Sequence, residues 1–164
     1  MKNRFFLLIA LFALFAISDV SAQFYKIKKV AITEVVDKSG EVSDGTKTFV
    51  RSALTDAICN SEGYQGYDKI SFKSLEMNFD RNGNISSATL TYVQKQMMEY
   101  ILISEITTLD KQTVLLSARI VNTSTGEIVT SSSVRTYADL DYLGEACNSL
   151  CCKLVGAIQY FDLV

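Results

Sequence analysis

Three segments in the second half of the chain have the patterns of strands: the first is strongly apolar, the second alternates apolar and polar side chains, and the third is rich in Thr, Ser and Val. They span residues 100–107, 112–122 and 127–137, and their many β-branched side chains favour strands. The links between them are only a few residues long, and such short links join antiparallel neighbours. The pattern therefore predicts an antiparallel three-stranded meander.

The last segment has the period of a helix. Apolar side chains recur at intervals of three and four residues, which places them on one helix face. The members of this stripe are Leu140, Leu143, Cys147, Leu150, Cys151, Leu154 and Ile158. An acidic residue at its start, Asp139 or Asp141, suits the positive end of the helix dipole. We predict a C-terminal helix.

The first half of the mature chain predicts a strand at 28–36, a turn at 37–40, and a helix from Ser43 or Asp44 to about Asn60. Serine and aspartate are favoured N-caps, which supports this helix start. The apolar face of the helix comprises Val50, Ala53, Leu54, Ala57 and Ile58.

The middle of the chain has a weaker pattern. Residues 62–67 predict a loop, 68–72 a short strand and 75–79 a helical turn, and Ser87 is expected to cap a helix over 88–98. Four aromatic side chains of this region pack in the core or form a partner surface, and the sequence leaves both readings open. They are Tyr64, Tyr67, Phe72 and Phe79.

The order of these elements is strand, helix, strand, helix, three-stranded meander, helix. Such an order predicts an α/β fold: a sandwich of two or three layers with a mixed sheet of about five strands, an antiparallel C-terminal meander and a C-terminal helix. We expect residues 23–164 to form one domain.

Residues 1–22 have the features of a secretory signal peptide. Lys2 and Arg4 precede an apolar run over 5–17, and Val20-Ser21-Ala22 supplies small residues before a cleavage site. The run is shorter than the roughly 20 residues that span a bilayer, which argues against an uncleaved membrane anchor. No cysteine follows it closely, so lipid anchoring is not expected. We predict cleavage near Ala22 and a periplasmic or extracellular protein.

Four cysteines lie in the predicted mature chain: Cys59, Cys147, Cys151 and Cys152. An even number in an exported protein is compatible with disulfides, and the spacing alone does not fix a pairing. Two readings stay open. The cysteines are small buried core residues, or one disulfide joins Cys59 to the C-terminal group of three.

Composition narrows the chemistry. The chain has no histidine, which excludes a Ser-His-Asp triad, a Cys-His pair and a His-ligated metal site. The net charge of −2 argues against a nucleic-acid partner, and no glycine-rich nucleotide motif is present. The acidic pairs Asp139 with Asp141 and Glu99 with Glu105 are best explained as surface charges. We expect no enzymatic activity, no cofactor, no metal and no small-molecule substrate.

Four stretches resemble a known family of exported domains. They are Val30-Ala31-Ile32 with Asp37-Lys38-Ser39-Gly40, the strand Tyr100–Ile106, the hairpin Ala118–Asn122 with Ser124–Ile128, and Asn78-Phe79 with Gly83–Ser86. In this order they resemble the α/β domain of curli-secretion-channel (CsgG-like) proteins, the TolB amino-terminal domain and the lipoprotein activators of penicillin-binding proteins.

The resemblance implies a bacterial cell-envelope protein that acts through protein contacts. We expect an assembly, accessory or regulatory binding domain with an envelope protein as its partner. The alternative is a subunit of a CsgG-type outer-membrane secretion apparatus. The sequence does not indicate an oligomeric state.

The third meander strand is the candidate partner-binding element. Its serines and threonines suit a sheet edge, and an exposed edge is where a partner can add a strand. The residues expected to form this edge are Thr130, Ser132 and Val134.

Overall fold

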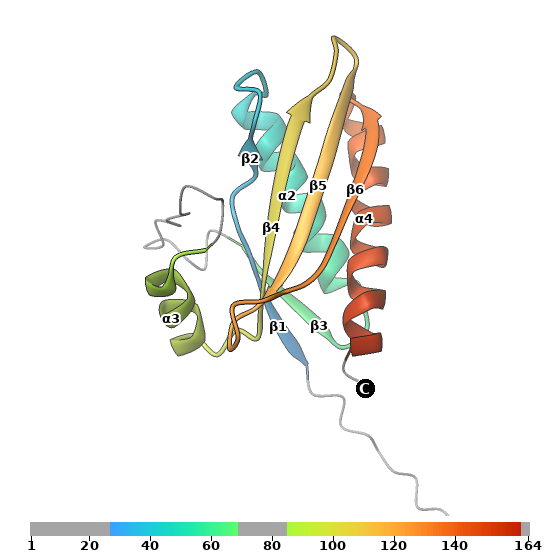
Figure 1. Cartoon of the computed structure of the whole chain (residues 1–164). Coiled ribbons are helices and arrows are strands. Elements are labelled where there is room, and N and C mark those ends of the chain that lie inside the picture. The colour runs from blue at the N-terminus through green and yellow to red at the C-terminus, as the bar shows by residue number, and fades with distance from the viewer. Residues whose placement is uncertain (1–26, 69–84, 162–164) are drawn as a thin grey trace, which may run out of the picture.

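The computed structural model describes residues 27–68 and 85–161. Within them lie three helices and six strands (Figure 1). In chain order they are β1 (Lys28–Ile32), β2 (Val36–Asp37), α2 (Asp44–Cys59), β3 (Tyr64–Tyr67), α3 (Ser87–Lys95), β4 (Tyr100–Thr108), β5 (Thr113–Asn122), β6 (Ile128–Tyr137) and α4 (Leu140–Phe161).

The strands form one mixed sheet in the order β3-β1-β4-β5-β6, and β2 pairs separately with β4. The pairs β1–β3, β1–β4 and β2–β4 are parallel. The pairs β4–β5 and β5–β6 are antiparallel, which confirms the predicted meander. The predicted fold class is also confirmed, with six strands in place of about five.

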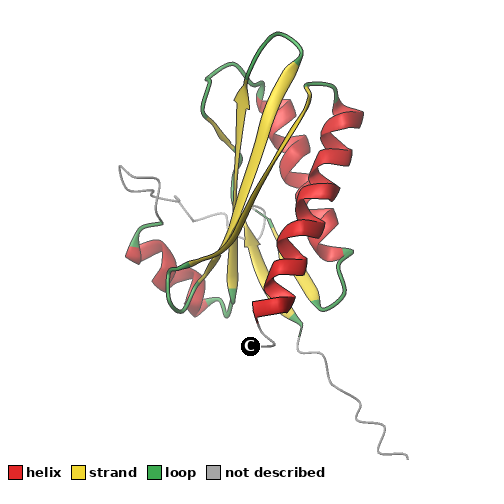
Figure 2. Ribbon diagram, turned by 45° about the vertical axis from the view of Figure 1, so that its right-hand side comes forward, coloured by secondary structure: helices red, strands yellow, loops and turns green. Residues whose placement is uncertain are grey.

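Helices α2 and α4 cover one face of the sheet, and α3 lies on the other side (Figure 2). Period-two alternation explains the main core, because every second residue of β4 and β5 faces the two long helices. Leu102 and Ile106 of β4 belong to this core with Leu116 and Ile120 of β5. The helices contribute the predicted stripes, including Leu54, Ile58, Leu143, Leu150, Leu154 and Ile158, all fully buried. Leu140, the first member of the α4 stripe, is instead exposed.

Helix α2 begins as predicted. The hydroxyl oxygen of Ser43 accepts a hydrogen bond from the backbone N–H of Thr46 at 3.1 Å, which identifies Ser43 as the N-cap. At the far end the helix stops at Cys59, close to the expected Asn60.

The strand predicted over 28–36 is interrupted, which corrects that prediction. Ile32 pairs with Leu102, but Val36 pairs with Glu105, so the β1–β2 side contains one more residue than β4. Uninterrupted alternation after Val30 and Ile32 would place Glu34 in the core, and burying an unpaired carboxylate is costly. The extra residue leaves Glu34 exposed and buries Val35.

Strand β3 corrects a second prediction. Residues 64–67 were expected to be a loop, but they pair in parallel with β1 at the edge of the sheet. Tyr64 is buried in the main core, and Tyr67 packs against the opposite face. The predicted strand at 68–72 falls almost entirely outside the described residues, as do the helical turn at 75–79 and the aromatic residues Phe72 and Phe79.

Helix α3 covers one end of the second sheet face. Its Val93 packs with Ile101, Ile103 and Val121 in a smaller apolar cluster. The N-cap is Ser86, one residue before the expected Ser87, and the helix ends at Lys95 rather than Met98. Met97 then adopts a φ of 58°, in the left-handed region, so the helix cannot continue in regular geometry.

Candidate functional site

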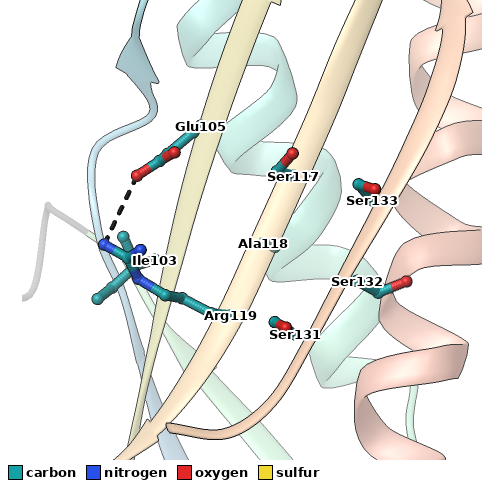
Figure 3. A pocket seen from close by; sticks show the side chains of 8 residues that line it. All are labelled: Ile103, Glu105, Ser117, Ala118, Arg119, Ser131, Ser132 and Ser133. Atoms are coloured by element: carbon teal, nitrogen blue, oxygen red, sulfur yellow. Dashed lines mark ion pairs between the residues drawn. The ribbon is translucent and has the colours of Figure 1, made fainter. Parts of the chain in front are cut away.

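The second sheet face carries polar side chains beyond the part that α3 covers. Strand register arranges these side chains, together with the apolar and buried Ile103, in two rows that cross β4, β5 and β6. Ile103, Arg119 and Ser131 form one row, and Glu105, Ser117 and Ser133 form the next. Together with Ala118 and Ser132, these residues line a hollow of about 340 Å³ (Figure 3). We call this surface the open face.

The carboxylate of Glu105 forms ion pairs with two cationic side chains of the open face. The Oε1 atom of Glu105 lies 3.5 Å from Nη2 of Arg119 and 3.7 Å from Nζ of Lys38. The side chains of Glu105 and Arg119 are each one quarter exposed. Strand β2 brings Lys38 here, because Val36 and Asp37 pair with Glu105 and Ile106. The three groups together carry one excess positive charge.

The chemistry of the hollow fits recognition. Ser131 and Ser133 are exposed, and a hydroxyl group can both donate and accept a hydrogen bond. The carboxylate of Glu105 is engaged by two cations, and the chain has no histidine to activate a serine. The surface can therefore hydrogen-bond a partner and pair with an anionic group.

Strand β6 forms the edge of the sheet next to this hollow. The backbone N–H of Ala138 donates to the carbonyl oxygen of Gln112 at 2.8 Å, and hydrogen-bonded and non-hydrogen-bonded pairs alternate along an antiparallel ladder. From that starting point, the alternation points the backbone groups of Ser131, Ser133, Arg135 and Tyr137 away from β5. The side chains of Ser131, Ser133 and Arg135 lie on the open face, whereas the Tyr137 ring packs edge-on against Tyr142 of α4, with 5.2 Å between the ring centroids.

The predicted edge residues Thr130, Ser132 and Val134 do lie in β6, and all three are half-buried. By the same alternation their backbone groups face β5, and Val134 packs against the main core. The sequence therefore located the strand, whereas the outward hydrogen-bonding positions are the odd-numbered ones. Only the register of β6 against β5 shows which residues of β6 direct their backbone groups outward.

The four predicted cysteines occupy two different environments. Cys147 and Cys151 are buried in the main core, and Cys59 and Cys152 are exposed. Burial raises the pKa of Cys147 to about 12 and that of Cys151 to about 11. The Sγ atom of Cys59 accepts a hydrogen bond from the backbone N–H of Gly66 at 3.3 Å. All four are free thiols in this structure, and a disulfide from Cys59 to the C-terminal group stays a prediction.

A second hollow of about 340 Å³ lies between α2 and the interrupted β1–β2 segment. Its polar lining residues are Glu34, Asp44, Lys47, Thr48 and Arg51. Lys47 Nζ lies 2.7 Å from Asp44 Oδ1, and the hydrogen bond that Lys47 donates to this carboxylate raises the pKa of Lys47. With two acidic and two basic side chains, this hollow favours neither an anion nor a cation.

Neither a membrane-spanning helix nor a metal cluster is found in the described part of the chain. No helix there is both long and apolar enough to cross a membrane. Residues 27–68 and 85–161 also hold no group of three or more Cys, Asp or Glu side chains placed to bind a metal ion.

Comparisons with known proteins identify the fold. No family model matches the sequence, and no curated protein matches it significantly. Among solved structures, the chain is similar to the PelC dodecamer from Paraburkholderia phytofirmans, with 13% identity, a TM-score of 0.55, and coverage of 81% of this chain and 88% of PelC. It is also similar to the LpoB C-terminal domain from Escherichia coli, with 14% identity, a TM-score of 0.52, and coverage of 71% and 87%.

TolB from Acinetobacter baumannii shares the same fold. The identity is 13% and the TM-score 0.56, and the match covers 80% of this chain but only 28% of TolB. The chain thus has the fold of the LpoB C-terminal domain and of part of TolB, which confirms this part of the sequence resemblance. At these identities the likeness defines the class of fold.

Proposed function

We propose that this chain is an exported, non-enzymatic protein-binding domain of the bacterial cell envelope, which acts as an assembly, accessory or regulatory component. The observation that carries the proposal is the open face: a polar hollow that continues to a strand edge, which is unpaired among the described residues 27–68 and 85–161. Exposed strands and their side-chain pockets are a recurrent way of binding a polypeptide, because the backbone supplies affinity and the pockets supply specificity.

Two further features support this proposal. The fold is that of LpoB and of part of TolB, and the N-terminal segment has the features of a signal peptide, with cleavage expected near Ala22. The Glu105–Arg119–Lys38 group supplies directional charge, and charge at an interface fixes the register of a partner more than it adds affinity.

Site-specific photo-cross-linking in living cells tests the proposal. A photoreactive amino acid at Ser117, on the floor of the hollow, is expected to yield an adduct with another envelope protein. Ser52 is the matched control, because it is an exposed residue of α2 on the other side of the sheet. Equal adducts from Ser52, or no heterologous adduct from Ser117, would contradict the proposed function.

A second candidate follows from the similarity to PelC, whose solved form is a dodecamer. In this alternative the chain is a ring-forming subunit of a CsgG-type secretion or assembly apparatus of the outer membrane. The mass of the purified protein in solution separates the candidates. A discrete high-order oligomer supports the ring, and a monomer or a dimer contradicts it.

A further inference from the structure

Strand β6 has few of the features that protect sheet edges from pairing. It is ten residues long and contains one charged residue, Arg135, with neither lysine nor proline. Protected edges are short or strongly bulged, or carry lysine or proline. The register shift near Ile120 and Val121 affects only the first residues of β6. From Thr130 to Tyr137 the strand pairs with β5 without interruption, and its outer side is unpaired within the described residues.

We infer that β6 pairs antiparallel with β6 of a second copy of this chain, in a register centred on Ser133, so that two copies share one continuous sheet. This inference rests on the proposed function, because it names the partner for the edge of the same binding surface. In such a dimer the second copy occupies the β6 backbone, and an envelope protein contacts the side chains that line the hollow of the open face.

The pleat restricts the register of such a pair. Opposed residues in a sheet must lie on the same face, so an outward-pointing odd residue pairs with another odd residue. With the two-fold axis at Ser133, Ser131 lies opposite Arg135 of the partner subunit, and the reverse pair forms symmetrically. Each of these residues directs its N–H and C=O outward, so the three pairs are all hydrogen-bonded pairs.

Charge and strand overlap favour the register centred on Ser133 over the registers centred on nearby residues. A pair centred on Arg135 would place two guanidinium groups opposite each other, which is destabilising. A pair centred on Ser131 would leave Tyr137 beyond the end of the partner's strand. Pairs centred on Ser132 or Val134 also keep odd residues opposite odd residues, but the first leaves Tyr137 opposite Glu127, outside β6, and the second overlaps over fewer residues. Centring on Ser133 avoids these problems.

The ends of β6 complement each other in the same register. Ile128 and Tyr137 are 54% and 53% exposed, although both are large apolar side chains. Antiparallel pairing brings Tyr137 of each copy to the Ile128–Val129 end of the other copy. Aromatic and β-branched side chains form favourable cross-strand contacts, so each end of the shared interface covers Ile128 and adds to the contact that Tyr137 already makes with Tyr142 of α4.

Light scattering of the full purified chain over a concentration series tests the pairing. We expect a dimer with twice the mass of the chain. Ser133→Lys places two ammonium groups opposite each other at the axis and should weaken dimerisation by about tenfold or more. Ser124→Lys is the matched control, because Ser124 is an exposed serine of the β5–β6 turn. Circular dichroism of both variants establishes that they are folded.

Cysteine cross-linking tests the register independently of stability. In a Cys59→Ser, Cys152→Ser background, which removes the exposed thiols, Ser133→Cys should form an interchain disulfide on mild oxidation. Opposed hydrogen-bonded residues have Cα atoms about 5.5 Å apart, within the range that a disulfide spans. Ser131→Cys should not cross-link, because its opposite residue in the partner subunit is Arg135.

The outcomes separate this inference from the proposed function. A monomer at every concentration, a dimer that Ser133→Lys leaves intact, or a Ser131→Cys cross-link as strong as that of Ser133→Cys overturns the β6 pairing. A high-order ring overturns it as well. In each of these cases a heterologous adduct at Ser117 would still support the proposed function. Conversely, a Ser133-centred dimer without such an adduct would support the β6 pairing and contradict the proposed function.

Discussion

The carboxylate of Asp37 closes the turn between β2 and α2. Its Oδ1 accepts hydrogen bonds from the backbone N–H groups of Ser39 and Gly40, both at 2.9 Å, and from the Ser39 hydroxyl at 2.7 Å. Its Oδ2 accepts from the N–H of Val42 at 2.8 Å. Partial desolvation raises the pKa of Asp37. The combined effect of these hydrogen bonds is larger and in the opposite direction, so the pKa is about 2. Gly40 supplies the φ of 74° that the turn requires.

Asp37→Asn is therefore expected to change how stability depends on pH. The pKa of Asp37 is lowered from 3.8 to about 2 in the folded protein, so the carboxylate stabilises the fold above about pH 4. This contribution is lost as the pH falls from about 4 to about 2. Thermal unfolding across that range should show a smaller acid-induced drop in Tm for Asp37→Asn than for the parent. Asp56→Asn on the exposed surface of α2 is the control, and an identical drop in all three proteins would refute the prediction.

Gly66 shows a close approach that the sequence does not reveal. A Cβ atom there would lie 2.9 Å from Cδ1 of Ile32, 3.2 Å from the carbonyl oxygen of Thr55 and 3.3 Å from Sγ of Cys59. The absence of a side chain at Gly66 allows β3 to lie against both β1 and α2.

Gly66→Ala should destabilise the fold by about 1–3 kcal/mol, because the added methyl group overpacks this contact. The matched variant is Gly156→Ala in α4, where a Cβ atom meets nothing within 4 Å. That change should stabilise the helix by about 0.5–1 kcal/mol. Denaturant unfolding measures both changes, and equal effects of the two substitutions would contradict the packing argument.

At the scale of elements, long periodic segments were predicted well and short ones were not. The strands β4, β5 and β6 and the helices α2 and α4 repeat their pattern over several turns or pleats, so a single polar residue does not obscure the period. Strand β3 contains only Tyr-Gln-Gly-Tyr, and the glycines at 63, before it, and at 66, within it, favoured a loop. Its conformation depends on pairing with β1, a tertiary contact that local propensity does not describe.

Thiol labelling tests how α4 packs. Cys59 and Cys152 should react with a thiol reagent in the folded protein, whereas Cys147 and Cys151 should react only after unfolding. Burial both shields the latter two and raises their pKa values to about 12 and 11, so they carry little thiolate at neutral pH. Two thiols that never react without a reductant would instead demonstrate the disulfide that the sequence suggested.

On the scale of the whole molecule, the two sheet faces have different roles. The face under α2 and α4 holds most of the large buried side chains, whereas the open face carries ion pairs and hydroxyl groups at the surface. Partly exposed ion pairs contribute little to stability. The polar composition of the open face therefore suits partner recognition better than stabilisation of the fold.

Glu105→Gln should separate binding from stability. The substitution keeps the size of the side chain but removes the charge that Arg119 and Lys38 share, so the free energy of unfolding should change by less than about 1 kcal/mol. The heterologous adduct at Ser117 should decrease, because the charges that orient the partner have changed. Leu150→Ala, in the main core, is the comparison for a structural residue, and it should lower the free energy of unfolding by about 2–5 kcal/mol. A comparable loss of stability in Glu105→Gln would assign that residue a structural role.

The candidate site was only partly predictable. The sequence pointed to the third meander strand and gave Glu105 as a surface charge, but it did not connect Glu105 with Arg119 or Lys38. Both Glu105 and Arg119 occupy polar positions of adjacent strands, so the correct β4–β5 register would have brought them together. Lys38 reaches the site only because of the extra residue between β1 and β2.

The sequence by itself determined the α/β class, the antiparallel meander, the two long amphipathic helices and the absence of histidine chemistry. These properties follow from local periodicity, short links and composition, which do not depend on distant contacts. Tertiary structure alone decided the pairing of β3 with β1, the interruption that buries Val35, the Glu105–Arg119–Lys38 group and the outward positions of β6. Each of these depends on the register between segments that are far apart in the chain, and a shift of one residue would reverse which side chains face the core.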